Sequence, residues 1–299
     1  MCEINRIECG IPRIASRTFT FEDSRKDTQF EDSRKDTQFE DSRKDTQFED
    51  SRKDTQFEDS RKDTQFEDSR KDTQFEDSRK DTQFEDSRKD TQERLSVFIP
   101  EVVDAQYGTY VWPSAVVLAQ YVWSRRLDLK EQTVLELGAG VSLPGVVAAK
   151  CGAKIILSDD ANTLLWQHTC RRSCDANNLH EVLTLPLTWG DISAHLALLA
   201  PLHLILGSDV FYEPADFEDI LVTVVFLLQK NPTAEFWMTY QERSADWTIE
   251  ALLHKWKLTC VHVDLESFDA NKCELAGSSL PGNHNIQMIL IRLCTDQEM

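Results

Sequence analysis

The sequence predicts an α/β domain in which a mostly parallel sheet carries helices on both faces. From Thr133 onward, short apolar runs rich in β-branched residues alternate with longer helix-like stretches. Two glycines follow the first of these runs directly. Such alternation is typical of parallel sheets, because crossover helices connect their strands. A ligand would then bind beyond the carboxyl ends of the strands, near the switch point after the first one.

The predicted strands follow in order along the chain as short apolar runs. They are TVLEL (133–137), KIILSD (154–159), EVLTLPL (181–187), LHLILGSD (202–209), AEFWMTY (234–240), LTCVHVDL (258–265) and NIQMILIRL (285–293). The helices expected between them cover 143–151, 161–178, 214–229 and 244–256. Pro214 suits a first helical turn, where no backbone NH is needed, and a Ser or Asp caps the last helix.

Upstream lies a nine-residue unit, FEDSRKDTQ, that runs in eight identical copies from Phe21 to Gln92. A nine-residue step turns a helix through about 900°, so successive phenylalanines alternate sides and build no apolar face. An odd step does the same in a strand. Ordering one copy costs roughly 9–18 kcal/mol of backbone entropy, against about 1.5–3 kcal/mol for one buried Phe. We therefore expect disorder; the alternative is a multivalent docking tail.

The chain thus divides into a short N-terminal segment (1–20), the repeat (21–92) and one domain (93–299) that we expect to fold alone. Each copy sums to −1, so the repeat supplies −8 of the formal net charge of −19. An acidic domain argues against binding of a nucleic-acid backbone and favours a cationic partner. The alternative is that acidity only keeps the domain soluble.

Cysteine usage and the N-terminus indicate a soluble intracellular protein. None of the eight cysteines forms a CxxC pair, and Cys170 with Cys174 lacks a second ligand pair, so no metal site is expected. The first twenty residues mix acidic and basic side chains, unlike a signal peptide. The longest apolar stretch, 220–228, is too short to span a membrane.

Glycines and acids follow the first two strands. Gly138 and Gly140 allow a tight turn and close approach of a ligand. Asp159, at the end of the second strand, is placed to accept both hydroxyls of an adenosine ribose. Its alternative role is a helix cap, which Asp160 could fill instead. Leu143 replaces the third glycine of the dinucleotide fingerprint, which disfavours a nicotinamide-dependent oxidoreductase.

Glu136 lies inside an apolar strand, where an unpaired carboxylate would be expensive. Two compatible interpretations remain. The acid is satisfied by backbone NH groups of the glycine turn, or it lies near the cationic end of a bound cofactor.

These motifs resemble a known family. The ExGxG of residues 136–140 and the acid ending the second strand are similar to seven-stranded S-adenosylmethionine-dependent methyltransferases. VWPSAVVLAQYV, LTWGD and SDVFY narrow the resemblance to methyltransferase family 16. It covers residues 110–292, and the repeat has no counterpart in it. The resemblance implies a Rossmann-like seven-stranded sheet, mostly parallel with an antiparallel last strand, and S-adenosyl-L-methionine as cofactor.

The resemblance also implies roles for the matching positions. Trp112 would close over the cofactor, and Trp189 would pack beside its adenine; the alternative for either Trp is core packing. The predicted cofactor-binding residues are Trp112, Glu136, Gly138, Ala139, Gly140, Asp159, Trp189 and Ser208.

SDVFYEPADFED carries five carboxylates within eleven residues. Some suit the first turn of a helix, but Asp209 and Tyr212 are not explained that way. In the family their DxxY pattern faces the substrate nitrogen, which implies transfer of a methyl group from a sulfonium to a protein nitrogen. Glu242 is a second acid that could reach a guanidinium. Two carboxylates gripping a guanidinium favour arginine.

The resemblance points to arginine in histone H3, chromatin regulation of transcription, and a location in nucleus and cytoplasm. The wider family contains many lysine methyltransferases, so lysine in a non-histone partner is the alternative acceptor. A non-catalytic cofactor-binding scaffold is the alternative from another class.

Overall fold

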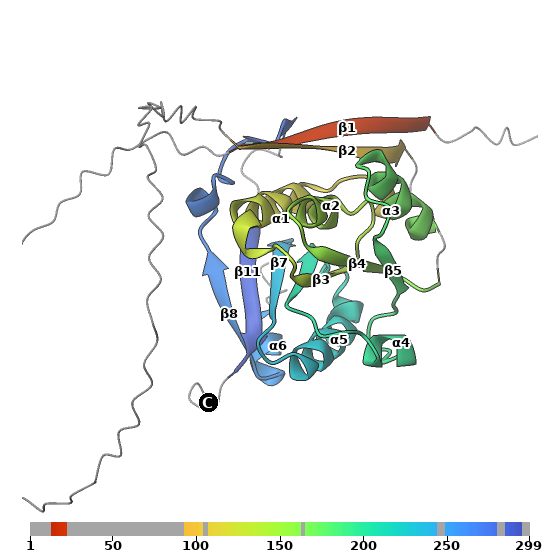
Figure 1. The fold of residues 1–299 in the computed structure, drawn as a ribbon. Helices are drawn as coiled ribbons and strands as arrows, with labels where there is room; N and C mark the ends of the chain where they lie inside the picture. Colours follow the sequence, from red (N-terminus) through yellow and green to blue (C-terminus); the bar gives the residue numbers. More distant parts are fainter. Residues whose placement is uncertain are drawn as a thin grey trace, which may run out of the picture. The chain divides into compact units, whose positions relative to one another are not determined.

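The computed structural model describes residues 13–22, 93–103, 107–162, 165–243, 249–279 and 285–294. These fall in one compact unit, shown in Figure 1. A seven-stranded sheet forms its centre, in the order β5-β4-β3-β6-β7-β11-β8. The pairs among β3 to β7 are parallel, and β11 is antiparallel to both β7 and β8. The predicted sheet, with its antiparallel last strand, is confirmed.

All seven predicted strands are present, with small shifts at their ends. They are β3 (Thr133–Leu137), β4 (Lys154–Asp159), β5 (Leu183–Pro186), β6 (Leu204–Ser208), β7 (Glu235–Gln241), β8 (Leu258–Val263) and β11 (Ile286–Leu293). The helices are α1 (Pro113–Ser124), α2 (Leu143–Lys150), α3 (Leu165–Ala176), α4 (Ala194–Ala197), α5 (Phe217–Lys230) and α6 (Glu250–Lys255). Short elements complete the unit: η1 (Tyr107–Thr109), η2 (Arg126–Asp128), η3 (Pro214–Asp216), η4 (Leu265–Phe268), β9 (Glu274–Leu275) and β10 (Ser278–Ser279).

Two helices differ from the prediction. The helix expected at 214–229 divides into the short 3₁₀ turn η3, which begins at Pro214, and α5. The helix expected at 244–256 is seen as α6, and its predicted cap lies outside the described residues. The short helix α4 follows Ser193, whose hydroxyl accepts a hydrogen bond from the Leu196 NH, and it was not predicted.

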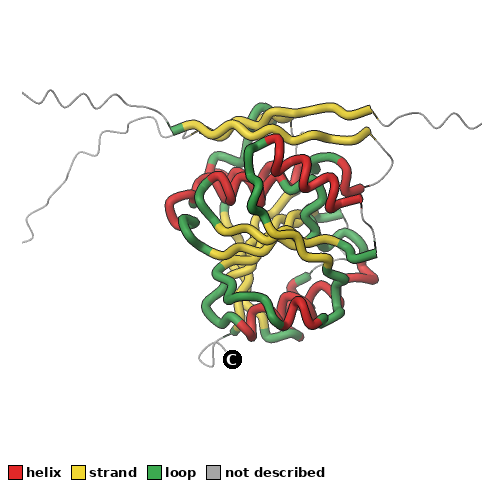
Figure 2. The backbone as a smooth tube through the Cα atoms, turned by 45° about the vertical axis from the view of Figure 1, so that its right-hand side comes forward, coloured by secondary structure: helices red, strands yellow, loops and turns green. Residues whose placement is uncertain are grey.

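The helices cover the two faces of the sheet separately. Figures 1 and 2 show α1, α2 and α3 on one side, and α4, α5 and α6 on the other. Each face of the sheet has its own hydrophobic core, because successive side chains of a strand point to opposite faces. Trp237 of β7 packs with the α1 and α2 side chains, whereas Met238 packs with those of α5.

A further pair of strands lies over α1 and α2. β1 (Arg13–Glu22) pairs antiparallel with β2 (Arg94–Val103), from Arg13 opposite Val103 to Glu22 opposite Arg94. Phe19 and Phe21 are fully buried and belong to the same core as α1 and α2. This layer explains why α1 is buried around most of its circumference.

The predicted boundary at residue 93 therefore differs from the structure. Phe21 and Glu22 open the first repeat copy, yet they complete β1. The alternation in RTFTFE, with phenylalanines inward and threonines between them, has the period of a strand. It was missed because the partner strand begins only after the last copy. Residues 23–92 lie outside the described residues, and their disorder stays a prediction.

We expect the two ways of shortening the chain to have opposite effects on stability. Deleting residues 30–92 keeps one copy and the Glu22–Arg94 pairing, and it shortens the connection from about 70 residues to about eight. Because closure entropy scales with the logarithm of loop length, this chain should be more stable by about 2 kcal/mol. Deleting residues 1–92 removes Phe19 and Phe21 from the core, and burial of two Phe side chains is worth roughly 3–6 kcal/mol.

Urea unfolding followed by tryptophan fluorescence compares the three chains. A 93–299 fragment as stable as the full chain would contradict the inclusion of β1 in the domain.

Candidate active site

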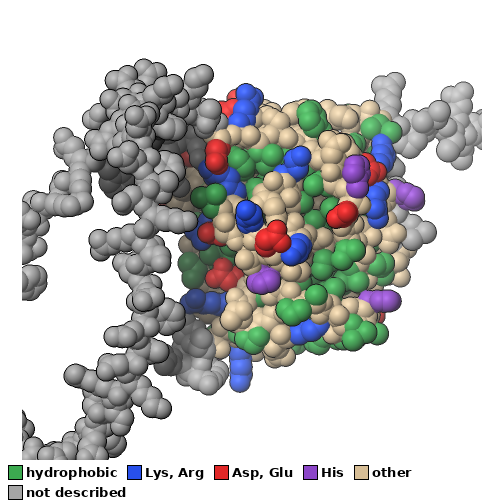
Figure 3. Space-filling view, in the orientation of Figure 1, with side chains coloured by type: hydrophobic (Ala, Val, Ile, Leu, Met, Phe, Trp, Pro, Cys, Tyr) green, Lys and Arg blue, Asp and Glu red, His purple; other side chains and the backbone are tan. Residues whose placement is uncertain are grey.

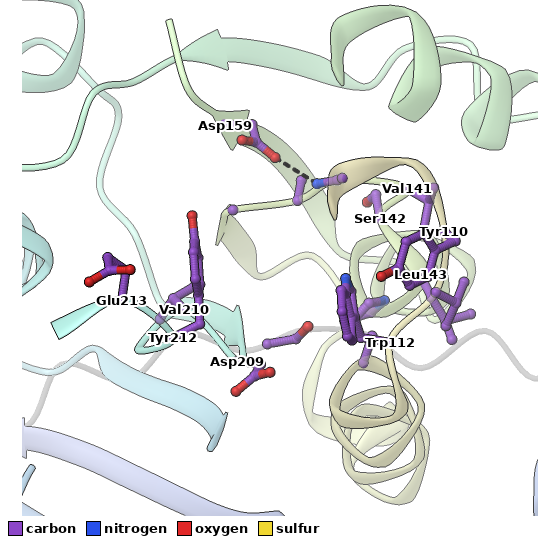
Figure 4. Close-up of a pocket in the computed structure, with 18 of the residues that line it drawn as sticks. Tyr110, Trp112, Val141, Ser142, Leu143, Asp159, Asp209, Val210, Tyr212 and Glu213 are labelled. Atoms are coloured by element: carbon purple, nitrogen blue, oxygen red, sulfur yellow. Dashed lines mark hydrogen bonds between the residues drawn. The ribbon is translucent and has the colours of Figure 1, made fainter. Parts of the chain in front are cut away.

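A cavity of about 410 Å³ opens at the carboxyl ends of β3, β4 and β6 (Figure 4). β3 is the central strand there, with β4 on one side and β6 on the other, so the cavity lies at the predicted switch point. Its lining includes all but two of the predicted site residues: Trp112, Gly138, Ala139, Gly140, Asp159, Trp189, Ser208, Asp209 and Tyr212.

The turn after β3 requires glycine. Gly138 and Gly140 have φ values of 61° and 51°, in the left-handed region that other residues rarely adopt. A Cβ on Gly138 would also lie 3.2 Å from Val210. The turn is held to β4, since the Ala139 NH donates to the Ser158 carbonyl at 2.9 Å. The ligand-facing backbone is therefore set before any ligand arrives.

Asp159 faces this turn rather than the following helix. Its Oδ2 accepts from the Gly140 NH at 2.7 Å, and its Oδ1 accepts from the Asp160 NH at 2.8 Å. Each oxygen keeps a second lone pair for a ribose hydroxyl. Burial raises the pKa of Asp159, and the two NH groups counteract the shift. The local turn is instead made by Asp160, whose Oδ1 accepts from the Asn162 NH and side-chain amide.

Glu136 lies behind the turn and is not among the described residues that line the cavity. It is fully buried, and the Ser142 hydroxyl donates to its Oε2 at 2.7 Å. Burial raises its pKa to about 8, although hydrogen bonds from Ser142 and the Gly145 backbone lower it. A Cβ on Gly145 would collide with this carboxyl group. The carboxyl group is satisfied inside the protein, as predicted, but by the Ser142 hydroxyl and the Gly145 backbone at the start of α2 instead of by NH groups of the glycine turn. The predicted place near a bound cofactor stays a prediction.

Aromatic side chains flank the cavity. Tyr110 and Trp112 have ring centroids 4.7 Å apart, and Trp189 and Tyr212 have centroids 6.3 Å apart. Figure 4 shows Tyr110 and Trp112 on one side and Tyr212 on the opposite side. Aromatic faces of this kind suit both a flat heterocycle and a cation.

The segment that carries Trp112 is positioned by the β1–β2 layer. Glu101 of β2 is buried, and its Oε1 accepts from the Val111 NH at 2.7 Å. Arg17 of β1 pairs with the same oxygen at 3.2 Å. A contact between β1 and β2 therefore reaches the residue next to Trp112, which no local pattern in the sequence indicates.

Asp209 lies at the floor of the cavity in an unusual backbone conformation. Its φ is 55°, a left-handed value that is uncommon for a residue other than glycine. The conformation is held from β7, since its NH donates to the Thr239 carbonyl at 2.8 Å and its Oδ1 accepts from the Gln241 NH at 3.3 Å. The side chain thereby turns into the cavity from the end of β6.

Arg243, which was not predicted, meets this carboxylate with two hydrogen bonds. Nη1 lies 3.0 Å from Asp209 Oδ1, and Nη2 lies 2.5 Å from Oδ2. The predicted Glu242 is not among the described residues that line the cavity. Within β7, Thr239 bonds to the Ser114 carbonyl on the α1 side. Both Glu242 and Arg243 lie beyond the end of the strand at Gln241, so the period of the strand does not decide which of them reaches the cavity.

The cavity is also lined by residues for which no site role was predicted, among them Gly108, Tyr110, Ser142 and Glu213. Tyr110 could have been noticed because it stands two positions before Trp112. Gly108 has no such signal: it lies against Gly140, whose Cβ would be 3.3 Å from the Gly108 carbonyl oxygen.

The described residues contain no group of three or more His, Cys, Asp or Glu side chains placed to hold a metal ion. Within the same residues, no helix combines the length and apolarity needed to cross a membrane.

The buried Glu136 predicts a pH-dependent loss of stability. Its pKa is about 8 in the folded protein against an ordinary 4.5, so the folded state retains a proton that the unfolded chain releases. Its contribution is complete at low pH and is lost as the pH rises toward 8, by at most about 1.4 kcal/mol per pH unit.

Glu136→Gln keeps a hydrogen-bond acceptor without this titration. We expect the variant to gain stability relative to the native chain steadily between about pH 5 and pH 8, where the carboxyl titrates differently in the two states. Urea unfolding of both chains across this range measures the difference. A difference that does not change with pH would contradict the shifted carboxyl.

Known proteins are similar to this chain over the region that carries these motifs. The model of methyltransferase family 16, described as lysine methyltransferase, matches residues 91–250. A Xenopus laevis protein named histone-arginine methyltransferase METTL23 is 59% identical over 202 residues, which cover 68% of this chain and 86% of that protein. The Homo sapiens protein of that name is 56% identical over 187 residues, covering 62% of this chain and 98% of that protein.

Protein N-lysine methyltransferase METTL21A of Xenopus tropicalis is 35% identical over 118 residues, covering 39% of this chain and 54% of that protein. The resemblance inferred from the motifs is confirmed. The chain belongs to methyltransferase family 16 and is an S-adenosyl-L-methionine-dependent methyltransferase.

Proposed function

We propose that this enzyme methylates an arginine side chain in a basic protein, with histone H3 as substrate. The observation that carries the proposal is the Asp209 carboxylate, which holds a guanidinium with both oxygens inside the cavity. The relatives named histone-arginine methyltransferase support the same acceptor. We further propose that the enzyme acts in chromatin regulation of transcription and that it is located in the nucleus and the cytoplasm.

The cavity fits the cofactor. We assign the Gly138–Gly140 backbone to its amino-acid portion, Asp159 to its ribose, and the faces of Trp112 and Trp189 to its sulfonium and adenine. Ser208 lines the floor beside Asp209. The cofactor supplies an electrophilic methyl group on a sulfonium. The protein therefore needs to align an acceptor nitrogen and exclude water more than to provide a strong acid.

Electrostatics at the cavity favours a cationic substrate. Tyr212 is 46% exposed. Burial raises its pKa, and four nearby carboxylates raise it further: those of Asp159, Asp160, Glu213 and Asp216. Such a cluster attracts a basic peptide and repels a phosphate backbone. On the face of the described unit seen in Figure 3, basic and acidic side chains are interspersed, without a continuous basic patch.

Asp209 is suited to hold and orient the acceptor. Its side chain is only 7% exposed, so its attraction for a cation is weakly screened. An acceptor nitrogen that receives the methyl group of the bound cofactor would have to lose a proton. Asp209 stabilises the positive charge on the acceptor and is placed to accept this proton, while the Tyr212 hydroxyl is a further polar group at the opening.

Lysine is the second candidate acceptor. The family is described as lysine methyltransferase, and the METTL21A relative is named protein N-lysine methyltransferase; both names favour lysine. An ammonium would use one of the two Asp209 oxygens at a time, whereas a planar guanidinium uses both.

A direct test is transfer of an isotopically labelled methyl group from the cofactor to purified core histones by the full chain, followed by amino-acid analysis. Label in methylarginine supports the proposal, and label in methyllysine moves the acceptor to the second candidate. Binding of the cofactor without label in any histone would favour a non-histone substrate or the scaffold alternative.

Asp209→Asn should lower the methyl-transfer rate by about 100-fold or more, because the acceptor loses its anionic partner. Cofactor affinity should change little, since Asn fills the same volume. Tyr212→Phe should have a smaller effect. Steady-state rates and calorimetric cofactor binding measure the two quantities.

The matched control is Asp175→Asn, which removes an exposed carboxylate on α3 outside the cavity. An Asp209→Asn chain with the native rate would contradict the role of this carboxylate.

A further inference from the structure

We propose that Arg243 is a built-in competitor of the substrate: its guanidinium occupies the Asp209 carboxylate, and an acceptor side chain must displace it to bind. The inference deepens the proposed function, because it rests on Asp209 as the group that holds the acceptor. Beyond that function, it assigns to Arg243 the role of setting the affinity of the site for any cationic side chain.

The contacts of Arg243 are those expected of a substrate guanidinium. Both of its terminal nitrogens bond to Asp209, one to each oxygen, at 3.0 and 2.5 Å. Nη1 also donates to the Gln241 carbonyl at 3.1 Å. Pairing with Asp209 raises the pKa of Arg243, against the opposing effect of burial. Arg243 and Asp209 both line the cavity, so the ion pair lies where the acceptor must enter.

The ion pair is placed so that it can open. β7 ends at Gln241, so Arg243 lies two residues beyond the last residue of the strand. Its side chain is 30% exposed, whereas that of Asp209 is 7% exposed. Movement of the arginine would leave the sheet pairing intact and would expose its charge to water. The carboxylate remains fixed, because the backbone of Asp209 is held by Thr239.

Displacement by an arginine acceptor exchanges like for like. The entering guanidinium forms the same two hydrogen bonds that Arg243 gives up, while Arg243 returns to solvent. An intramolecular partner has a high effective concentration, which favours the closed pair. The apparent dissociation constant of any ligand of Asp209 is therefore the intrinsic constant divided by the fraction of protein in which the pair is open.

Removal of Arg243 should therefore change the affinity for cationic ligands in a defined way. The open fraction belongs to the free protein and not to the ligand, so removing Arg243 should tighten every cationic ligand of Asp209 by the same factor. A purely structural Arg243, which only keeps Asp209 ionised and oriented, predicts the opposite sign: its removal should weaken cation binding.

The test measures binding of two small probes, ethylguanidinium and ethylammonium, to the full chain by ligand-observed NMR. The variants are Arg243→Gln and Arg243→Lys. Arg125→Gln is the matched control, since it removes an arginine from an exposed ion pair with Asp128 outside the cavity. Asp209→Asn defines the part of the binding that depends on the carboxylate.

We expect Arg243→Gln to tighten the Asp209-dependent binding of both probes by about fivefold, and by the same factor for each. Arg243→Lys should show a smaller gain, because an ammonium competes through fewer hydrogen bonds. Arg125→Gln should bind like the native chain.

Unchanged or weaker binding of ethylguanidinium to Arg243→Gln would overturn the proposal. If Arg243→Gln does not fold, the Arg243→Lys comparison decides, and equal binding by it and the native chain would overturn the proposal as well. The probes report on the carboxylate without turnover. Failure of the chain to methylate arginine would therefore be a separate result, seen in the histone assay alone.

Discussion

The chain leaving β3 reverses within three residues, between the carboxyl groups of Glu136 and Asp159. On the cavity side of the turn, Asp159 accepts a hydrogen bond from the Gly140 NH at 2.7 Å. On the buried side, Glu136 accepts one from the Ser142 hydroxyl, also at 2.7 Å. Two left-handed glycines make the reversal possible, and Gly145 leaves room for the buried acid. With the turn set in this way, its backbone lies open to a ligand, and the first residues of α2 are aligned beside it.

The second support of the site comes from the edge of the domain. β1 and β2 cover α1 and α2, and Glu101 carries that contact to Val111, next to Trp112. The position of Trp112 on this side of the cavity thus depends on a strand, β1, that ends within the first repeat copy. The repeat is accommodated because loop closure depends only weakly on length, so a long connection between β1 and β2 is compatible with their pairing.

Charge in the site is arranged around one desolvated carboxylate. Asp209 projects from a left-handed position at the end of β6, and its backbone is held there by a hydrogen bond to Thr239 of β7 that does not involve the side chain. The surrounding acids make the opening attractive to basic segments. Arg243 neutralises the charge of the carboxylate through an ion pair. This ion pair connects the segment after β7 to the floor of the site.

Much of this was readable from the sequence, because strand periodicity, glycine spacing and acids at strand ends are local properties. These patterns predicted the seven strands, the switch-point site, the glycine turn and Asp159, whereas the role of Asp209 and most of the other lining residues came from the family resemblance. The pairing of β1 with β2 was decided only in the tertiary structure, since about 70 residues, nearly all of them repeat, separate the two strands. The tertiary structure also decided that Glu136 faces inward to Ser142, and that Arg243 rather than Glu242 reaches the floor of the cavity. These outcomes depend on contacts that form only in the folded chain, and local patterns in the sequence do not specify them.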